Sequence, residues 1–342
     1  MGRSTIRDVA AEARVSLGTA SRVANQRTGV NLEMKRRVER AIKKLSYTPD
    51  ASAQSMRLKS TRTIGILIRD FSSPAFVSFA NVVQSMLFQA GYVPLLAGYD
   101  DRPERELEIL HAFAQRRIDG LIVTTSNDSN AKLARARVEL GIPTILFDRD
   151  PNEAQDVIAI EHCEGVKQAM RYLFGMGHRR IALVTGQRSV RPGRERIHGF
   201  EEAYAEAGLT SDPNMICDSN FSADYAFTQT TALLRSKKRP TAIIVGGVSM
   251  LPGALRAIRS IGLLVPADIS IIGATDPELS ELMTPRITEL RVDYPAMGRA
   301  ASALILGRLQ GTVEGTPRVL RFETSLLERE SCAPPAARRR AA

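Results

Sequence analysis

Residues 5–26 read TIRDVAAEARVSLGTASRVANQ, and this stretch decides how the first part of the chain folds. Its apolar residues first recur at helical spacing, which predicts a helix with one buried face. After a break, Ser16 can cap a second short helix whose Ala20, Val23 and Ala24 face inward. Two short helices joined by a tight turn form a helix-turn-helix.

The second predicted helix presents small and polar side chains on its outer face. A helix that enters the major groove of DNA needs an apolar back and a front that matches base edges. Arg22 has the planar fork that pairs with guanine, and hydroxyl and amide groups can reach phosphates or bases. The alternative is a solvated bundle whose polar front binds nothing. The predicted DNA-binding residues are Thr5, Ser16, Leu17, Gly18, Thr19, Ser21, Arg22 and Asn25.

A third helix, capped by Asn31, completes the module, and its predicted core stripe is Met34, Val38, Ile42 and Leu45. Positive charge is concentrated in this part of the chain. Residues 1–60 hold 13 Lys and Arg against 5 Asp and Glu, whereas the other 282 residues hold 34 against 32. Charge gathered in one small module indicates a polyanionic partner for that module alone.

From residue 63 onward, short apolar runs alternate with amphipathic segments. The predicted helices include 75–90, 102–117 and 164–176. Strands that alternate with helices indicate parallel sheets covered on both faces. The predicted strands are 63–68, 93–97, 120–125, 144–147, 157–160, 181–185, 242–245 and 269–273.

Several stretches resemble the LacI/GalR family of transcriptional regulators in the same order along the chain. They are the opening stretch, SYTPDASAQSM (46–56), TRTIGILIRDFSSPAF (61–76), RRIDGLIV (116–123), GHRRIALVTG (177–186), RERIHGFEEAYAEAGL (194–209) and VPADISIIG (265–273). The resemblance implies an α/β body of periplasmic-binding-protein type, with two doubly wound subdomains, behind an all-α helix-turn-helix domain.

The resemblance also implies a division of the chain. We expect a helix-turn-helix domain (1–47), a hinge (48–61), a first subdomain (62–161 with 292–320), a second subdomain (162–291 with 321–330) and a disordered tail (331–342). In the family the hinge becomes helical on DNA, and Met56 occupies the position of its minor-groove wedge; the alternative is a flexible linker whose Met56 touches nothing. Arg14 stands where the family has a turn glycine, and a left-handed backbone there would cost about 1 kcal/mol.

Family effector positions carry over to a cleft between the subdomains. Arg196 matches an arginine that binds an effector hydroxyl or carboxylate, and Phe221 matches an aromatic platform for a sugar or base. Both phenylalanines are equally consistent with core packing, and Arg196 with a pair to Glu195 or Glu201. The predicted effector-binding residues are Phe76, Asp148, Arg196, Phe221 and Thr275.

Two departures from the family pattern concern this cleft. Gly247-Val248 replaces Asn-Asp, and Gly273-Ala274-Thr275-Asp276 replaces a Gly-aromatic-Asp-Asp turn, so groups that bind neutral sugars are missing. Arginines remain in segments that can reach the cleft. This favours an anionic effector such as a sugar acid or sugar phosphate. The arginines are Arg69, Arg149, Arg188, Arg191, Arg194 and Arg196.

Enzyme motifs are missing from the sequence. There is no phosphate-binding loop, GVSML (247–251) lacks the second glycine of a nucleophile elbow, and the four histidines lack metal-ligand spacing. We expect no cofactor and no metal, and read His178 as a turn or capping residue. Three scattered cysteines predict buried thiols rather than disulfides. No apolar run reaches the eighteen or so residues of a membrane span, and no secretory stretch begins the chain, so a cytoplasmic location is expected.

Together these features predict a sequence-specific transcriptional repressor, which is not an enzyme. It is expected to bind double-stranded DNA at a palindromic operator as a homodimer and to respond to a small effector, a sugar or sugar acid. The alternative is a ligand-independent or activating regulator with the same fold.

Overall fold

The computed structural model describes residues 4–25, 29–47, 60–274 and 277–335. The chain divides into two compact units, Met1–Thr61 and Arg62–Ala342. Met56 and Thr275 lie outside the described residues, so the predicted wedge and this predicted effector contact stay predictions.

Within residues 4–25 and 29–47, the first unit contains three helices, α1 (Ile6–Ala13), α2 (Leu17–Ala24) and α3 (Leu32–Lys44). Thr5 and Asp8 form a reciprocal capping box at the start of α1. The predicted caps are also present: Ser16 Oγ accepts from Thr19 N, and Asn31 Oδ1 accepts from Glu33 N. The helix-turn-helix prediction is therefore confirmed in its local structure.

The small core of this unit differs from the prediction at one position. Met34 is 43% exposed, while Val38 and Ala41 are buried. Ile42 and Leu45 pack partly against the core, which α3 therefore enters through its middle and end.

Arg14 ends α1 in the left-handed conformation, with φ 51° and ψ 50°. Its backbone N–H bonds back to the last turn, and its carbonyl accepts a bond from Arg37 Nη2 at 3.0 Å. The turn therefore keeps the geometry that glycine favours, although an arginine occupies it.

The second unit holds two six-stranded sheets. The first has the order β11-β5-β4-β3-β1-β2, and all its neighbouring strands are parallel. Its strands are β1 (Thr63–Ile68), β2 (Val93–Gly98), β3 (Gly120–Val123), β4 (Thr144–Phe147), β5 (Asp156–Ile160) and β11 (Val319–Phe322).

The second sheet has the order β12-β10-β9-β8-β6-β7 and is parallel except at its β12 edge. All eight predicted strands correspond to observed ones, while β7, β10, β11 and β12 had not been predicted. Those four are short or carry charged residues within the run. The strands of this sheet are β6 (Ile181–Val184), β7 (Ile216–Cys217), β8 (Ala242–Val245), β9 (Ser270–Ala274), β10 (Thr288–Arg291) and β12 (Ser325–Leu327).

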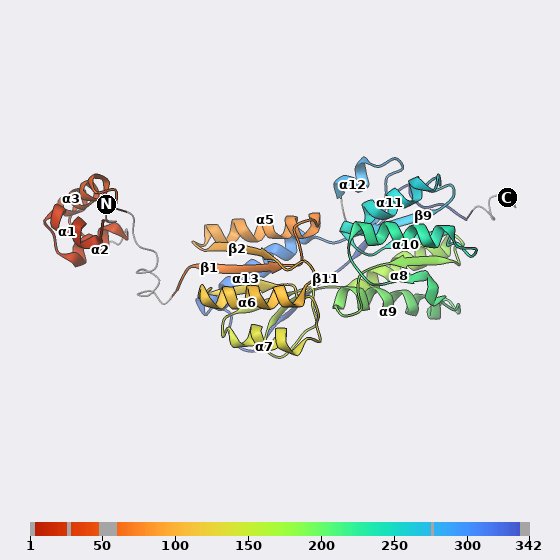
Figure 1. Cartoon of the computed structure of the whole chain (residues 1–342), viewed down its shortest axis with the longest axis horizontal. Helices are drawn as coiled ribbons and strands as arrows, with labels where there is room; N and C mark the ends of the chain where they lie inside the picture. The colour runs from red at the N-terminus through yellow and green to blue at the C-terminus, as the bar shows by residue number, and fades with distance from the viewer. Residues whose placement is uncertain (1–3, 26–28, 48–59, 275–276, 336–342) are drawn as a thin grey trace. The chain divides into compact units, whose positions relative to one another are not determined.

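Helices cover both faces of each sheet, as the doubly wound prediction requires (Figure 1). On the first sheet, α5 (Pro74–Gln89) packs beside α13 (Tyr294–Gln310), and α6 (Pro103–Gln115) beside α7 (Ala131–Glu139). On the second, α8 (His162–Gly175) packs beside α9 (Arg191–Glu206), and α10 (Ala223–Arg235) beside α11 (Leu251–Ser260). A short helix, α12, spans Pro277–Leu282, and 3₁₀ turns span Pro213–Met215 and Val248–Met250.

The chain crosses between the two sheets three times: after β5, after β10 and between β11 and β12. The last crossing follows Phe322 rather than residue 320, because Arg321 and Phe322 still pair with β5. We call the part built on the first sheet subdomain 1 and the part built on the second subdomain 2.

The expected disordered tail does not begin at residue 331. Ser331 is fully buried and its Oγ donates to Ile271 O at 2.6 Å, and Cys332 is also buried. His178 follows the turn after α8, as expected for a turn or capping residue, and its N–H donates to Leu173 O at 3.0 Å. Its ring is also buried, and the ring nitrogens contact Thr241 Oγ1 at 2.8 Å and Ala333 O at 3.0 Å. The ring contact with Ala333 helps to hold the C-terminal segment, which is also bonded to Ser270 and Ile271 of β9. Cys217 and Cys332 are buried free thiols, as predicted, whereas Cys163 is a free thiol that is only partly buried.

Helices long and apolar enough to cross a bilayer do not occur in the described part of the chain.

Replacing Arg14 by glycine should relieve the left-handed strain and stabilise the first unit by about 0.5–1 kcal/mol. In the full-length protein, this stabilisation should raise the hydrogen-exchange protection factors of the α1 and α3 amides by about twofold to fivefold. Arg7→Gly is the control, because Arg7 is exposed within α1 and glycine there should lower protection by about 1 kcal/mol. Equal effects of the two substitutions would contradict this account.

Candidate functional site: a charged cavity between two subdomains

A cavity lies between subdomain 1 and subdomain 2, at the carboxyl ends of parallel strands from both sheets. Arg69 follows β1, Asp148 and Arg149 follow β4, and Gly247 follows β8. Ligands of open parallel sheets bind at this end of the strands, where connecting loops converge. Topology alone therefore makes this cavity the candidate binding site.

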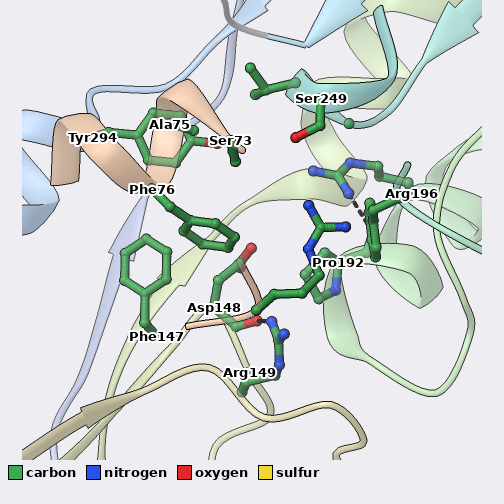
Figure 2. A pocket seen from close by; sticks show the side chains of 14 residues that line it. Ser73, Ala75, Phe76, Phe147, Asp148, Arg149, Pro192, Arg196, Ser249 and Tyr294 are labelled. Carbon is green, nitrogen blue, oxygen red and sulfur yellow. Dashed lines mark hydrogen bonds between the residues drawn. The ribbon is translucent and has the colours of Figure 1, made fainter. Parts of the chain in front are cut away.

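The predicted effector residues converge on this one cavity. Phe76, Asp148, Arg196 and Phe221 all line it, although they come from segments up to 145 residues apart. Figure 2 shows the rings of Phe76, Phe147 and Tyr294 on one side, with Pro192, Arg196 and Ser249 facing them.

The aromatic side chains of the cavity form two groups. Phe76 packs edge-on against Phe147, with ring centroids 5.9 Å apart, so one of its edges belongs to the core. Two guanidiniums lie near the ring of Phe221, with Arg69 Cζ 5.4 Å and Arg196 Cζ 5.9 Å from its centroid. Such distances are typical of cation–π contacts. Phe221 is therefore only partly a core residue, and its ring belongs to the charged side of the cavity.

Two glycines make room for the Phe221 ring. A Cβ at Gly186 would lie 2.0 Å from its Cε2, and one at Gly247 would lie 3.2 Å from its Cδ1. Gly247 and Val248 line the cavity where the family pattern has Asn-Asp. That departure removes two polar side chains and leaves space that an aromatic ring occupies.

Asp148 is the centre of a buried polar network that joins the subdomains. It has a left-handed backbone, φ 53°, at the end of β4, and its side chain is 9% exposed. His162 Nε2 lies 2.8 Å from Asp148 Oδ2, and Arg191 Nη1 lies 3.4 Å from Oδ1. Arg191 Nη1 also donates to Ile160 O at 2.6 Å. His162 begins α8 and Arg191 begins α9, so one carboxylate of subdomain 1 holds two helices of subdomain 2.

The protonation states of this network follow from its burial and charges. Burial alone would raise the pKa of Asp148, but His162, Arg191 and Arg149 outweigh it and hold that pKa at about 2. Burial and the positive charge of Arg196 lower the pKa of His162 to about 4. At pH 7 the carboxylate is therefore ionised and the imidazole is neutral, with Nε2–H donating to Asp148 Oδ2.

Most arginines near the cavity have carboxylate partners. Arg69 Nε lies 2.8 Å from Asp70 Oδ2, and Arg149 Nε lies 3.7 Å from Asp128 Oδ1 while donating to Thr125 O at 2.7 Å. The remaining predicted arginines, Arg188 and Arg194, do not line the cavity; they pair with Asp218 and Asp150.

Arg196 is the exception. Arg196 is buried, with only 9% of the residue exposed. Its Nη1 donates to Pro192 O at 3.3 Å. Among the residues that the structure describes, no carboxylate lies within 4.0 Å of it, and Glu195 pairs with Arg191 instead. Burial lowers the pKa of Arg196. The cavity therefore contains a buried cation for which the described protein groups provide one backbone acceptor.

The cavity also contains residues that sequence reasoning missed. Tyr294 precedes the α13 core stripe and is packed into the wall, where burial raises the pKa of its phenol. Ser249 presents a buried Oγ that has no hydrogen-bond partner within the described ranges. No local sequence pattern identifies His162 as part of the site, because its contribution is a contact with Asp148, which belongs to the other subdomain.

In the helix-turn-helix unit, the predicted DNA-binding residues divide into two groups. Leu17, Gly18 and Arg22 are exposed on α2. Thr5 and Ser16 are helix caps, and Asn25 Nδ2 donates to Ser21 O at 2.6 Å. Ser16 Oγ also lies 2.9 Å from Thr19 Oγ1. The capping and hydrogen-bonded residues therefore stabilise α1 and α2, and α2 carries the exposed residues Leu17, Gly18 and Arg22.

Comparison with known proteins agrees with this arrangement. A model of bacterial regulatory proteins of the lacI family matches residues 5–50, and a periplasmic binding protein-like domain matches residues 170–332. The HTH-type transcriptional repressor PurR of Erwinia tasmaniensis is 32% identical over 332 residues, covering 96% of this chain and 97% of the relative. The protein is a LacI-family transcriptional regulator.

Other members of the LacI family support the same relation. PurR of Aliivibrio salmonicida is 33% identical over 308 residues, covering 90% of this chain and 92% of that protein. The lac repressor dimer bound to operator and the anti-inducer ONPF superimposes with a TM-score of 0.85 at 27% identity, over 97% of this chain and all of that one. The CelR–cellobiose complex gives 0.73 at 28% identity, over 96% and 100%.

Membership of the LacI family confirms several predictions. The chain is a DNA-binding repressor with an effector-binding domain and not an enzyme. Its fold class is confirmed as a helix-turn-helix unit followed by an α/β body of periplasmic-binding-protein type. As a LacI-family transcription factor it acts in the cytoplasm.

The His162 pKa predicts a pH dependence. Unfolded histidine binds a proton near pH 6.5, but folded His162 binds one only near pH 4. Between these values the unfolded chain holds more protons, so stability falls as pH drops. From pH 7 to pH 5, wild type should lose about 2 kcal/mol more than His162→Gln in urea unfolding.

His111→Gln is the control for this comparison, because His111 is exposed on α6. It should keep the wild-type pH dependence. Parallel pH profiles for wild type and His162→Gln would show that His162 is not held neutral by the fold.

Proposed function

We propose that this LacI-family repressor binds a palindromic operator as a homodimer, and that a small anionic effector bound at Arg196 modulates its operator affinity. The effector class that fits best is a sugar acid or sugar phosphate. The observation that carries this proposal is the buried Arg196 guanidinium, which has no carboxylate partner among the described residues.

The charge argument rests on the cost of burial. A buried ion is costly unless it is paired, and pairing with an ionised ligand group gives strong, short hydrogen bonds. The planar fork of Arg196 suits a carboxylate or phosphate, since two parallel N–H groups can meet two oxygens. Asp148 does not compete for this role, because His162 and Arg191 already engage its two oxygens.

The aromatic wall supports a ligand with a ring. Phe221 offers an apolar face beside Arg196, and Ser249 Oγ is a nearby hydroxyl for a polar substituent. The apolar faces of sugar rings and the faces of bases both pack on aromatic side chains. Gly247 and Val248 provide no side-chain acceptor for neutral sugar hydroxyls at this wall.

The DNA side of the proposal rests on the first unit. Two copies of α2 related by a twofold axis can read two half-sites of a palindrome. The related lac repressor is a dimer bound to operator, which favours the same assembly here. We keep Met56 as the proposed minor-groove wedge on sequence grounds.

The effector prediction is tested by thermal shift with sugar acids, sugar phosphates, neutral sugars and free nucleobases. Anionic sugars should raise the melting temperature of wild type, and Arg196→Met should abolish that rise because the fork is lost. Arg188→Met should retain it, since Arg188 is exposed and pairs with Asp218.

Each alternative gives a distinct result in this panel. Stabilisation only by neutral sugars or bases would overturn the anionic proposal. Stabilisation by none would favour the ligand-independent regulator.

The DNA-reading role of Arg22 is tested with a site selected by wild type from random DNA. Arg22→Ala should lower affinity for that site by about 1–3 kcal/mol, roughly fivefold to 150-fold, and lower the ratio of specific to random binding. Lys43→Ala, at an exposed position on α3, should change the affinity for the selected site and the affinity for random DNA about equally. An unchanged specificity ratio in Arg22→Ala would contradict base reading by this residue.

A further inference from the structure

Three metal-binding side chains meet on subdomain 2, apart from the residues that line the cavity. Cys163 stands in the first turn of α8, while His198 and Glu202 lie one turn apart on α9. One ligand atom from each residue lies within 4.8 Å of the other two. The three come from two helices that pack against each other, so the fold rather than a local sequence motif creates the cluster.

The three side chains lie close enough for their ligand atoms to reach one metal ion. His198 Nε2 lies 3.1 Å from Glu202 Oε1, and Cys163 Sγ lies 3.7 Å from Glu202 Oε2. Zinc bonds of about 2.0–2.3 Å at tetrahedral angles separate neighbouring ligand atoms by about 3.3–3.6 Å. The two observed contacts are near that range but end on different oxygens of Glu202, and the three ligand atoms lie within 4.8 Å of one another, so side-chain rotations must bring them onto one ion.

We propose that Cys163, His198 and Glu202 form a binding site for a divalent transition metal of the zinc class, with water as the fourth ligand. Thiolate and imidazole donors favour zinc and cobalt over magnesium and calcium, which prefer sets of oxygen ligands. Two ligands at i and i+4 on one helix share a face, so α9 presents them together.

The backbone around the site is held in place. A Cβ at Gly199 would lie 2.4 Å from the carbonyl oxygen of Cys163, so glycine allows α9 to approach α8 closely at this level. This contact fixes the separation between the thiol and the two ligands of α9. Side-chain rotations are then sufficient to complete the metal site.

The neighbouring charges are compatible with metal binding. Lys167 forms ion pairs with Glu202, at 3.3 Å, and with Glu206. Its ion pair with Glu206 can therefore remain when Glu202 binds the metal. Burial and the nearby carboxylates Glu202 and Glu195 raise the pKa of Cys163 to about 11, so the free thiol is protonated.

Cobalt(II) is the probe, because a cobalt–thiolate bond gives a charge-transfer band in the near ultraviolet. Metal-free, untagged, full-length protein should bind one Co²⁺ per chain with this band, and Zn²⁺ should bleach it. Cys163→Ser should eliminate the band, whereas Cys332→Ser should keep it, because Cys332 is a buried core residue outside the cluster.

Further variants separate ligation from folding. His198→Ala and Glu202→Gln should weaken Co²⁺ binding by about tenfold or more, which is the loss seen even for residues outside the first ligand shell. Their side chains are largely at the surface, and their circular dichroism should match wild type. No thiolate band in wild type, or a band that persists in Cys163→Ser, would overturn the proposal.

Discussion

The α/β unit depends on one buried carboxylate. Asp148 ends β4 of subdomain 1, and its two oxygens face His162 and Arg191, which begin α8 and α9 of subdomain 2. Removing one partner of a buried ion pair leaves the other uncompensated, at a cost of about 3–5 kcal/mol. The left-handed backbone of Asp148 adds strain that the surrounding contacts must offset. The geometry of the cavity follows from this junction, because Arg196 lies on the same helix as Arg191.

A second junction beside the first reinforces it. Asp128 N donates to Ser189 O at 2.9 Å, and Asp128 Oδ2 accepts from Arg191 N at 2.5 Å. An effector between the subdomains therefore acts where they are already bound by directional contacts. It can shift operator affinity only through its preference between two arrangements of those contacts, typically by 1–3 kcal/mol of coupling.

The features that were predicted correctly from the sequence are those that depend on local sequence patterns. Strand periodicity located the central strands, and Ser16 and Asn31 were found as caps because capping depends on residues within the same turn. Four predicted effector residues line one cavity because family order fixed their places in the topology. Sequence reasoning missed contacts between segments that are distant in the chain. These are the contact of His162 with Asp148 and the contact of the His178 ring with Ala333, which lies 155 residues later. The exposure of Met34 was missed for the same reason, since helical periodicity shows which residues share a face but not which of them a neighbouring helix covers.

Reciprocal coupling between the cavity and the DNA is the central claim, and it can be measured directly. The affinity of the most stabilising anionic sugar should be determined by calorimetry with and without saturating operator DNA. The account predicts that operator changes the ligand Kd by the same factor, about 5-fold to 150-fold, by which ligand changes the operator Kd. Equal ligand affinities with and without operator would contradict it.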